Sequence, residues 1–204
     1  MTRLLDVVLA SLALVVLAPL LVVIAALVRA TSPGPALFRQ TRVGHLGAPF
    51  VMFKFRTMYD KSDDTLHREY VTRMLAAEKD ELGRGPDGLF KLDEDPRVTR
   101  IGGFLRRSSL DELPQLFNVL RGEMSLVGPR PALVWETESY KSYHHLRFQV
   151  KPGMTGLWQV CGRSKLSMNT ALDIDVQYVQ SWSLGLDLWI LAMTLPAVLR
   201  GGTR

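Results

Sequence analysis

The residue types best suited to chemistry in this chain are two adjacent carboxylates, Asp111 and Glu112. Such a pair can supply a nucleophile, a general base or oxygen ligands for a metal ion. Two guanidinium groups, Arg106 and Arg107, lie just upstream, and arginine is well suited to binding phosphate oxygens. The stretch from 106 to 115 is therefore a candidate site for chemistry on a phosphorylated substrate.

Local patterns predict the element that positions this pair. Apolar residues recur at the spacing of one helical face, at positions 113, 116, 117 and 120. Gly122 stands where a glycine commonly ends a helix, and Pro114 is tolerated only near a helix start. We therefore predict a helix that begins close to Asp111 and places the carboxylates at the positive end of its dipole.

A purely structural explanation of the same segment stays open. Ser109 and Glu112 fit the S-x-x-E capping box, in which both side chains bond to backbone N–H groups at a helix start. That motif requires no chemistry. The decision between the two explanations therefore depends on the rest of the chain.

Length and charge restrict the possible partners. At 204 residues the chain can bury one core, and its net charge of +5 requires a basic surface. Nucleic acid, an anionic membrane or a phosphorylated substrate would each suit that surface. The single cysteine, Cys161, excludes an internal disulfide and a cysteine-based zinc site, and indicates a reduced thiol facing a cytoplasm.

The N-terminal segment is apolar enough for a membrane. No charged residue occurs from Val7 to Val28, a run long enough to cross a bilayer. Pro19 lies in its middle and favours a kink, while Arg3 and Arg29 flank it and favour keeping both ends in the cytoplasm. A kinked helix that enters and leaves by the same face explains both features. An ordinary span with a tolerated proline remains the alternative.

Further basic residues lie on a predicted strand and in a stiff loop. The alternation from 50 to 56 predicts a short strand with Lys54 and Arg56 on one face. These two are either solvated surface charges or phosphate ligands. Farther along, two flanking prolines hold Arg130 in an extended backbone, which suits a guanidinium that binds phosphate.

Between and beyond these segments the patterns are less specific. We predict a helix from His67 to Leu82 and a turn at Asp95-Pro96. The adjacent His144 and His145 cannot both face one metal ion if they lie on a helix. We expect them at the surface or facing a substrate.

Two tryptophan-containing segments can each be explained in two ways. Trp158 suits stacking on a ligand ring as well as a place in the core. The apolar segment from 182 to 199 is short for a membrane span. Its tryptophans favour a helix lying at the membrane interface over a buried core helix.

Taken together, these pieces resemble the bacterial sugar transferase family, the monotopic phosphoglycosyl transferases. The resemblance runs from about Arg3 to Leu199, and its specificity comes from the number of ordered blocks rather than from any one. The blocks are Arg3-Leu4-Leu5-Asp6, Ser32-Pro33-Gly34-Pro35, Lys54-Phe55-Arg56-Thr57-Met58, Asp95-Pro96-Arg97-Val98-Thr99, Leu110-Asp111-Glu112-Leu113-Pro114-Gln115, Gly128-Pro129-Arg130-Pro131 and Pro152-Gly153-Met154-Thr155-Gly156.

The resemblance implies a fold and a location. The expected fold is mainly α with a few short strands: a re-entrant membrane helix over 1–31, bent at Pro19, and a small α/β catalytic domain over 32–204 with interfacial amphipathic helices. The domain would lie on the cytoplasmic face of a bacterial inner membrane. No four-span extension precedes the helix, so the chain looks like the short form of the family. It departs from the family at Ala18, where serine is frequent, and at Cys161, where asparagine is frequent.

It also implies a reaction. A sugar 1-phosphate passes from a UDP-sugar to a polyprenyl phosphate such as undecaprenyl phosphate, with UMP as the second product. The partners are then these two substrates and the lipid bilayer, without nucleic acid; a homodimer is left open. The sugar, and the glycan it initiates, do not follow from the motifs.

The family's functional residues carry over to matching positions here. Asp111 matches the nucleophile that forms a phosphosugar–aspartate ester, and Glu112 its partner, as metal ligand or general base. Magnesium would offset the charge of the diphosphate and of both acids. Phosphate or nucleotide contacts fall to a basic set, namely Lys54, Arg56, Arg106, Arg107, Arg130 and Arg147.

Two other classes of protein would use the same residues differently. A membrane-anchored, metal-dependent phosphodiesterase would hand the phosphoryl group to water and release free sugar phosphate without any lipid acceptor. A non-catalytic basic membrane adaptor would need neither acid and should tolerate Asp111→Asn.

Overall fold

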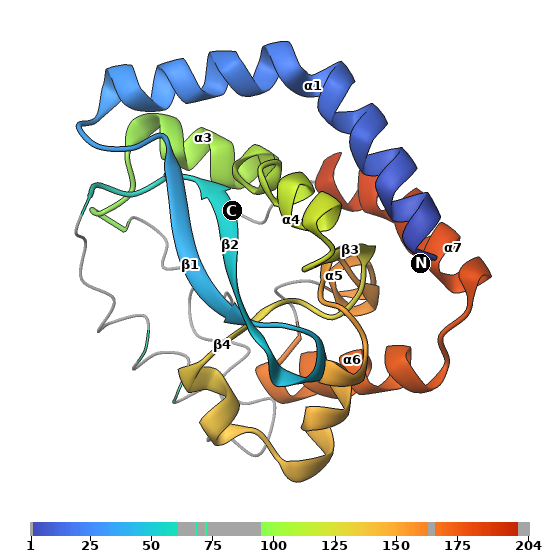
Figure 1. Ribbon diagram of the computed structural model, residues 1–204. Coiled ribbons are helices and arrows are strands. Elements are labelled where there is room, and N and C mark those ends of the chain that lie inside the picture. Colours follow the sequence, from blue (N-terminus) through green and yellow to red (C-terminus); the bar gives the residue numbers. More distant parts are fainter. Residues whose placement is uncertain (1, 61–67, 69–71, 73–94, 163–165, 200–204) are drawn as a thin grey trace.

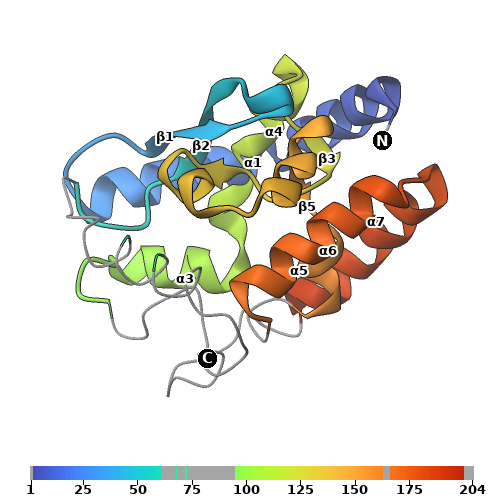
Figure 2. The same ribbon diagram turned by 90° about the horizontal axis from the view of Figure 1, so that it is seen from below.

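The computed structural model describes residues 2–60, 68, 72, 95–162 and 166–199. The fold is mainly helical with a few short strands, as expected (Figure 1). Helices α5–α7 gather on one side of the molecule and strands β1 and β2 on the other (Figures 1 and 2). In chain order the helices and strands are α1 (Arg3–Thr31), β1 (Leu37–Val43), β2 (Pro49–Phe55), α3 (Arg100–Ser108), α4 (Gln115–Arg121), β3 (Ser125–Val127), β4 (Ala132–Leu133), β5 (Gly153–Thr155), α5 (Leu157–Cys161), α6 (Met168–Gln180) and α7 (Leu184–Leu199).

Helix α1 stays continuous through Pro19, and it is visibly bent (Figure 1). A proline inside a helix removes one backbone hydrogen bond and clashes with the preceding turn, which accounts for the bend. Both halves of the helix pack on the rest of the molecule. Ala10 joins a cluster with Val119 of α4, while Ile24 and Val28 join another with Leu105 of α3. The helix therefore curves over the domain instead of projecting from it.

Polar contacts fasten the N-terminal end of α1. The Arg3 guanidinium donates to two carbonyl groups at the end of α4, that of Leu120 at 2.7 Å. The buried Asp6 carboxylate accepts from the Ser125 hydroxyl at 3.0 Å and from the Leu126 N–H at 2.9 Å. Because buried carboxylates are costly unless hydrogen-bonded, these contacts hold α1 in one position against β3.

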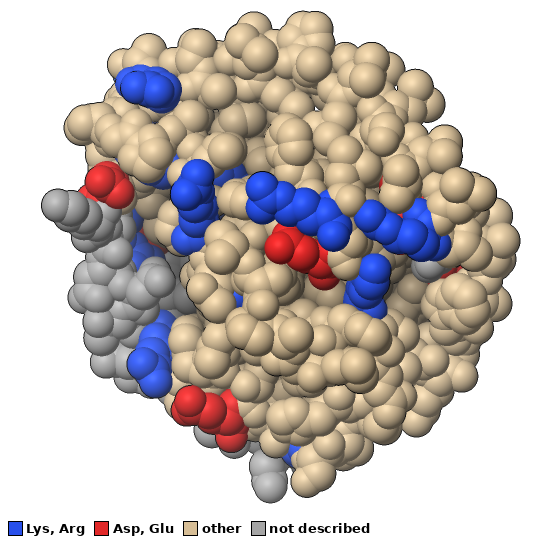
Figure 3. Space-filling view, viewed as in Figure 1, with Lys and Arg blue, Asp and Glu red and all other residues tan. Residues whose placement is uncertain are grey.

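The outer side of α1 is apolar and exposed. By length and composition alone the helix could cross a membrane, and only 11% of its most apolar stretch is buried within the molecule. Figure 3 shows a face that is largely uncharged above, where α1 runs, with basic side chains gathered across its middle. The exposed large apolar residues of α1 are Leu4, Val8, Leu12, Val15, Val16, Leu20, Val22, Val23 and Leu27.

Strand β2 confirms the strand predicted between 50 and 56. It pairs antiparallel with β1, whose other side pairs with β4, and β3 pairs parallel with β5. On the side of β2 away from β1, the buried Asn118 of α4 occupies the backbone groups. Its side chain accepts from the Phe53 N–H at 3.0 Å and donates to the Val51 carbonyl at 2.7 Å. One amide thus fixes α4 against the sheet and protects that edge from further pairing.

The C-terminal helix α7 is partly buried. Its only charged residue, Asp187, is fully buried and accepts from the Tyr178 hydroxyl at 2.7 Å and the Trp182 indole at 3.0 Å. Trp189 of α7 and Trp182, just before the helix, are each 46% exposed. An apolar side of this segment is therefore exposed. The interfacial location of α7 stays a prediction. The helix predicted from 67 to 82 lies outside the described residues, apart from positions 68 and 72.

Candidate active site

The two carboxylates lie in a single 3-10 turn, η3 (Leu110–Glu112), between α3 and α4. Helix α3 ends at Ser109, which adopts the left-handed conformation with φ of 58°. The predicted helix start close to Asp111 was therefore wrong: α4 begins at Gln115, after Pro114 at its N-cap position. Its predicted end is confirmed, since Gly122 caps it with φ of 81°.

The capping-box explanation of Ser109 and Glu112 is also wrong. The Ser109 side chain makes no capping hydrogen bond, because its left-handed backbone belongs to the end of α3. Glu112 instead accepts from the Lys54 ammonium of β2, with 2.8 Å between Nζ and Oε1. The structure thus brings together two of the predicted site residues from distant parts of the chain, and the glutamate is held by a cation rather than by a helix end.

Asp111 is buried and interacts electrostatically with an arginine of α3. The residue is 9% exposed. Burial lowers the pKa of Arg106, and the Asp111 and Asp95 carboxylates oppose that change. Asp95 itself is paired with Arg97 at 2.7 Å, and its hydrogen bonds to Arg97 lower the pKa of the carboxyl. The turn predicted at Asp95-Pro96 is confirmed.

One arginine in this region was missed from the sequence. Arg42 of β1 is buried and donates to the Pro131 carbonyl at 3.0 Å and to Gln40 at 2.6 Å. Burial and the neighbouring Arg130 lower the pKa of Arg42 to about 10, against the opposing effect of carboxylates that include Glu112. Arg42 therefore ties β1 to the Arg130 loop. Recognising β1 as a strand would have been the signal, because its pairing with β4 brings these residues together.

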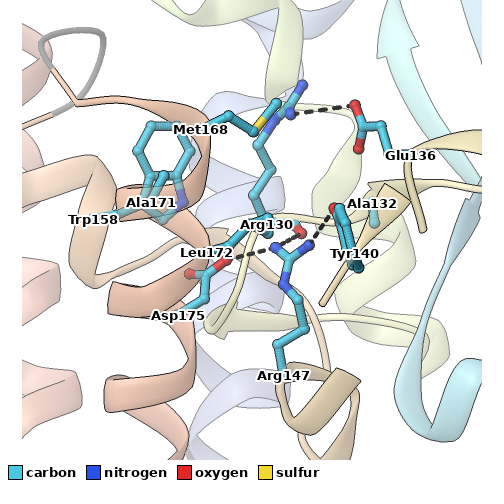
Figure 4. A pocket seen from close by; sticks show the side chains of 10 residues that line it. All are labelled: Arg130, Ala132, Glu136, Tyr140, Arg147, Trp158, Met168, Ala171, Leu172 and Asp175. Carbon is cyan, nitrogen blue, oxygen red and sulfur yellow. Dashed lines mark hydrogen bonds and ion pairs between the residues drawn. The ribbon is translucent and has the colours of Figure 1, made fainter. Parts of the chain in front are cut away.

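The Arg130 loop forms one wall of a pocket (Figure 4). The Arg130 side chain is 34% exposed and lies 4.0 Å from Glu136, measured from Nη1 to Oε1. Trp158 is buried and also lines the same pocket, so burial in the core and contact with a ligand are both compatible with its position. Its indole faces the pocket alongside Met168 (Figure 4).

Two predicted phosphate ligands have other roles in this structure. Arg147 is buried beneath the loop, where its guanidinium donates to the Arg130 carbonyl at 2.7 Å and to Asp175. Arg56 is buried at the end of α1, where it donates to the Ser32 carbonyl at 2.8 Å and to the neighbouring Pro33 carbonyl. Both guanidinium groups donate to internal acceptors, and Arg147 also lines the pocket. Arg56 is held at the end of α1, whereas Lys54 binds Glu112.

The remaining predicted residues differ in how exposed they are. Arg107 is exposed on α3. His145 is exposed, as one of the two predicted alternatives has it. His144 is fully buried with Nε2 2.9 Å from Asp173 Oδ1, so the surface alternative is wrong for this residue. Among the described residues no three His, Cys, Asp or Glu side chains cluster as a metal site. The two carboxylates of the turn, Asp111 and Glu112, are the candidate ligands for a cation there.

Comparison with known proteins gives the family of this chain. The sequence model of a family described as bacterial sugar transferase matches residues 1–201. The exopolysaccharide production protein ExoY of Rhizobium meliloti is 46% identical over 193 residues, which cover 95% of this chain and 83% of ExoY.

Two further relatives are named by their reactions. A UDP-glucose:undecaprenyl-phosphate glucose-1-phosphate transferase of Caulobacter vibrioides is 43% identical over 205 residues, 97% of this chain and 69% of that protein. An undecaprenyl-phosphate galactose phosphotransferase of Salmonella typhimurium is 45% identical over 170 residues, 82% of this chain and 34% of that protein. The chain therefore belongs to the bacterial sugar transferase family of sugar-phosphate transferases.

Proposed function

We propose that this chain transfers a sugar 1-phosphate from a UDP-sugar to undecaprenyl phosphate, releasing UMP, as an early step of exopolysaccharide or related glycan synthesis. The observation that carries the proposal is the carboxylate turn, in which Asp111 and Glu112 are adjacent and Glu112 is bonded to Lys54. A carboxylate pair within a basic surround suits a phosphoryl group in transfer, because cations offset the charge that two anionic substrates bring. The names of the relatives supply the substrate class.

Asp111 is the nucleophile in this proposal. Its carboxylate oxygen attacks the phosphorus that bears the sugar; the bond from that phosphorus to the bridging oxygen breaks, and UMP leaves with the electron pair. An oxygen of undecaprenyl phosphate then attacks the same phosphorus and regenerates the carboxylate. Two steps avoid holding a diphosphate and a lipid phosphate together in one site.

The surrounding residues divide the remaining tasks. Lys54 fixes the orientation of Glu112, and Arg106 offsets negative charge beside Asp111. Arg130, a third exposed and held in a stiff loop, is suited to a phosphate oxygen of the donor. Glu112 and Asp111 fit magnesium, which takes one or two protein carboxylates and completes its shell with substrate phosphates and water. Bound there, the cation would supply positive charge to the diphosphate.

Trapping of the intermediate tests this proposal. Incubating the membrane-embedded protein with a UDP-sugar carrying a radiolabelled sugar phosphate, without lipid acceptor, should leave label on the protein and release UMP. Full kinetics should be ping-pong. Intersecting double-reciprocal lines without trapped label would favour direct transfer in a ternary complex. Steady release of free sugar phosphate without lipid would instead indicate a hydrolase.

The same proposal seats the domain on the cytoplasmic face of a membrane, through a re-entrant α1. Its support is that Arg3 and Asp6, at one end, and Ile24 and Val28, at the other, all contact the same domain. A straight span would carry Arg3 to the far side of the bilayer, away from its partners. The exposed apolar side of α1 would then lie in lipid.

We expect the N-terminus to be protected from the periplasm. A single cysteine at Thr2, in a Cys161→Ser background, should not react with a membrane-impermeant thiol reagent in intact cells, and should react after the cells are opened. Pro19→Ala should increase labelling in intact cells, because a straighter helix favours an ordinary span. Strong labelling with Pro19 in place would exclude the re-entrant topology.

A further inference from the structure

We infer that Asp175 is a positioning residue for Arg130 and acts through the buried guanidinium of Arg147. The inference rests on the proposed function, which gives Arg130 the donor phosphate as its ligand. Asp175 lies on α6, far from the carboxylate turn in sequence, and its carboxylate accepts from Arg147. Its influence would pass through the Arg147 guanidinium to the backbone carbonyl of Arg130 (Figure 4).

The first link joins Arg147 to the backbone of Arg130. One Arg147 nitrogen, Nη2, donates to the Arg130 carbonyl at 2.7 Å. Because Arg130 stands between Pro129 and Pro131, its backbone has few alternative conformations. A shift of its carbonyl therefore moves the whole residue, including the guanidinium that reaches the pocket.

The second link orients Arg147. The same nitrogen donates to Asp175 Oδ2 at 2.5 Å, and the other, Nη1, donates to the Tyr140 hydroxyl at 2.9 Å. Arg147 and Asp175 are both buried, with side chains 4% and 2% exposed. A buried guanidinium depends strongly on its counter-charge, so Asp175 sets where Arg147 lies.

A second carboxylate competes with Asp175 for Arg147. Glu136 lines the same pocket, lies 4.0 Å from Arg130 and attracts Arg147 as well. When Asp175 is neutral, Glu136 becomes the dominant carboxylate in the pocket, and we expect Arg147 to turn toward it. That rotation would break the hydrogen bond to the Arg130 carbonyl.

A double-mutant cycle tests the inference. Asp175→Asn should raise KM for the UDP-sugar about tenfold, with a smaller change in kcat, because it displaces a substrate-binding group and leaves the nucleophile in place. Arg130→Ala should also raise KM. In the Arg130→Ala background, Asp175→Asn should add little, since the group it positions is already gone. Additive effects of the two changes on KM would overturn the inference.

Control variants separate positioning from folding. Asp173→Asn changes a neighbouring aspartate of α6 that is bound to Tyr143 and His144, and it should leave KM unchanged. If Asp175→Asn does not fold, as judged by thermal melting, Tyr140→Phe removes one hydrogen bond of Arg147 instead. It should raise KM about two- to threefold, and only when Arg130 is present. An unchanged KM in Tyr140→Phe would overturn the inference, and an unchanged KM in Arg130→Ala would overturn the phosphate role of Arg130 itself.

Discussion

An Asp111→Asn variant should fold like the unmodified protein and lose sugar-phosphate transfer by about four orders of magnitude or more. Asparagine keeps the shape of the nine-tenths buried side chain but lacks the negative charge that makes the carboxylate a nucleophile. The loss should appear already in the first half-reaction: no UMP release from the UDP-sugar, and no label retained on the protein. The measurement is UMP release by the purified, membrane-embedded variant, beside its thermal melting curve.

The matched control for this change is Glu138→Gln. Glu138 is an exposed acid outside the candidate site, and its replacement alters the net charge of the protein by the same amount. It should release UMP at the normal rate. Normal UMP release by Asp111→Asn would remove Asp111 from the mechanism and leave the adaptor or a different nucleophile to be considered.

Chelation should stop turnover almost completely. EDTA removes divalent cations, and the two carboxylates of the turn would then repel the donor diphosphate, with only the basic side chains to offset that repulsion. Added magnesium should restore the rate in a saturable way. Undiminished turnover in EDTA would mean that the basic side chains alone offset the charge.

The magnesium titration also separates two roles for Glu112. If Glu112 is a ligand, Glu112→Gln should raise the magnesium concentration needed for half-maximal rate about tenfold or more. If it acts as a general base, the maximal rate should fall while that concentration stays the same. Lys54→Met, which removes the ammonium bonded to Glu112, is a useful companion because it disturbs the orientation of the carboxylate without replacing it.

Sequence patterns predicted the elements whose causes are local. The alternation of side chains from 50 to 56 predicted β2, and Gly122 predicted the end of α4. Both signals come from residues that are neighbours in the sequence. The start of α4 was missed by a few residues. Several turn geometries are compatible with Pro114 near a helix start and with Ser109 three residues before Glu112. In the structure Ser109 is left-handed, so α3 ends there and a separate turn precedes α4.

The roles of the arginines could not be predicted from local patterns. Arginine type indicates positive charge, but whether that charge meets substrate depends on partners that lie far along the chain. Arg147 meets Asp175 at a separation of 28 residues, and Arg42 meets Pro131 at a separation of 89. No local spacing encodes such pairings, so the internal partners of Arg147 were not predicted and Arg42 was not assigned to the site.

The fastening of α1 has a consequence for how the protein is made. Arg3 and Asp6 leave the ribosome first, yet their partners follow 116 to 120 residues later. At about 5–20 residues per second, synthesis leaves these two charged side chains without those partners for roughly 6–25 s. During that interval the apolar helix has no domain to curve over. Its final shape must therefore be acquired after translation has passed β3, when α4 and β3 become available as a template.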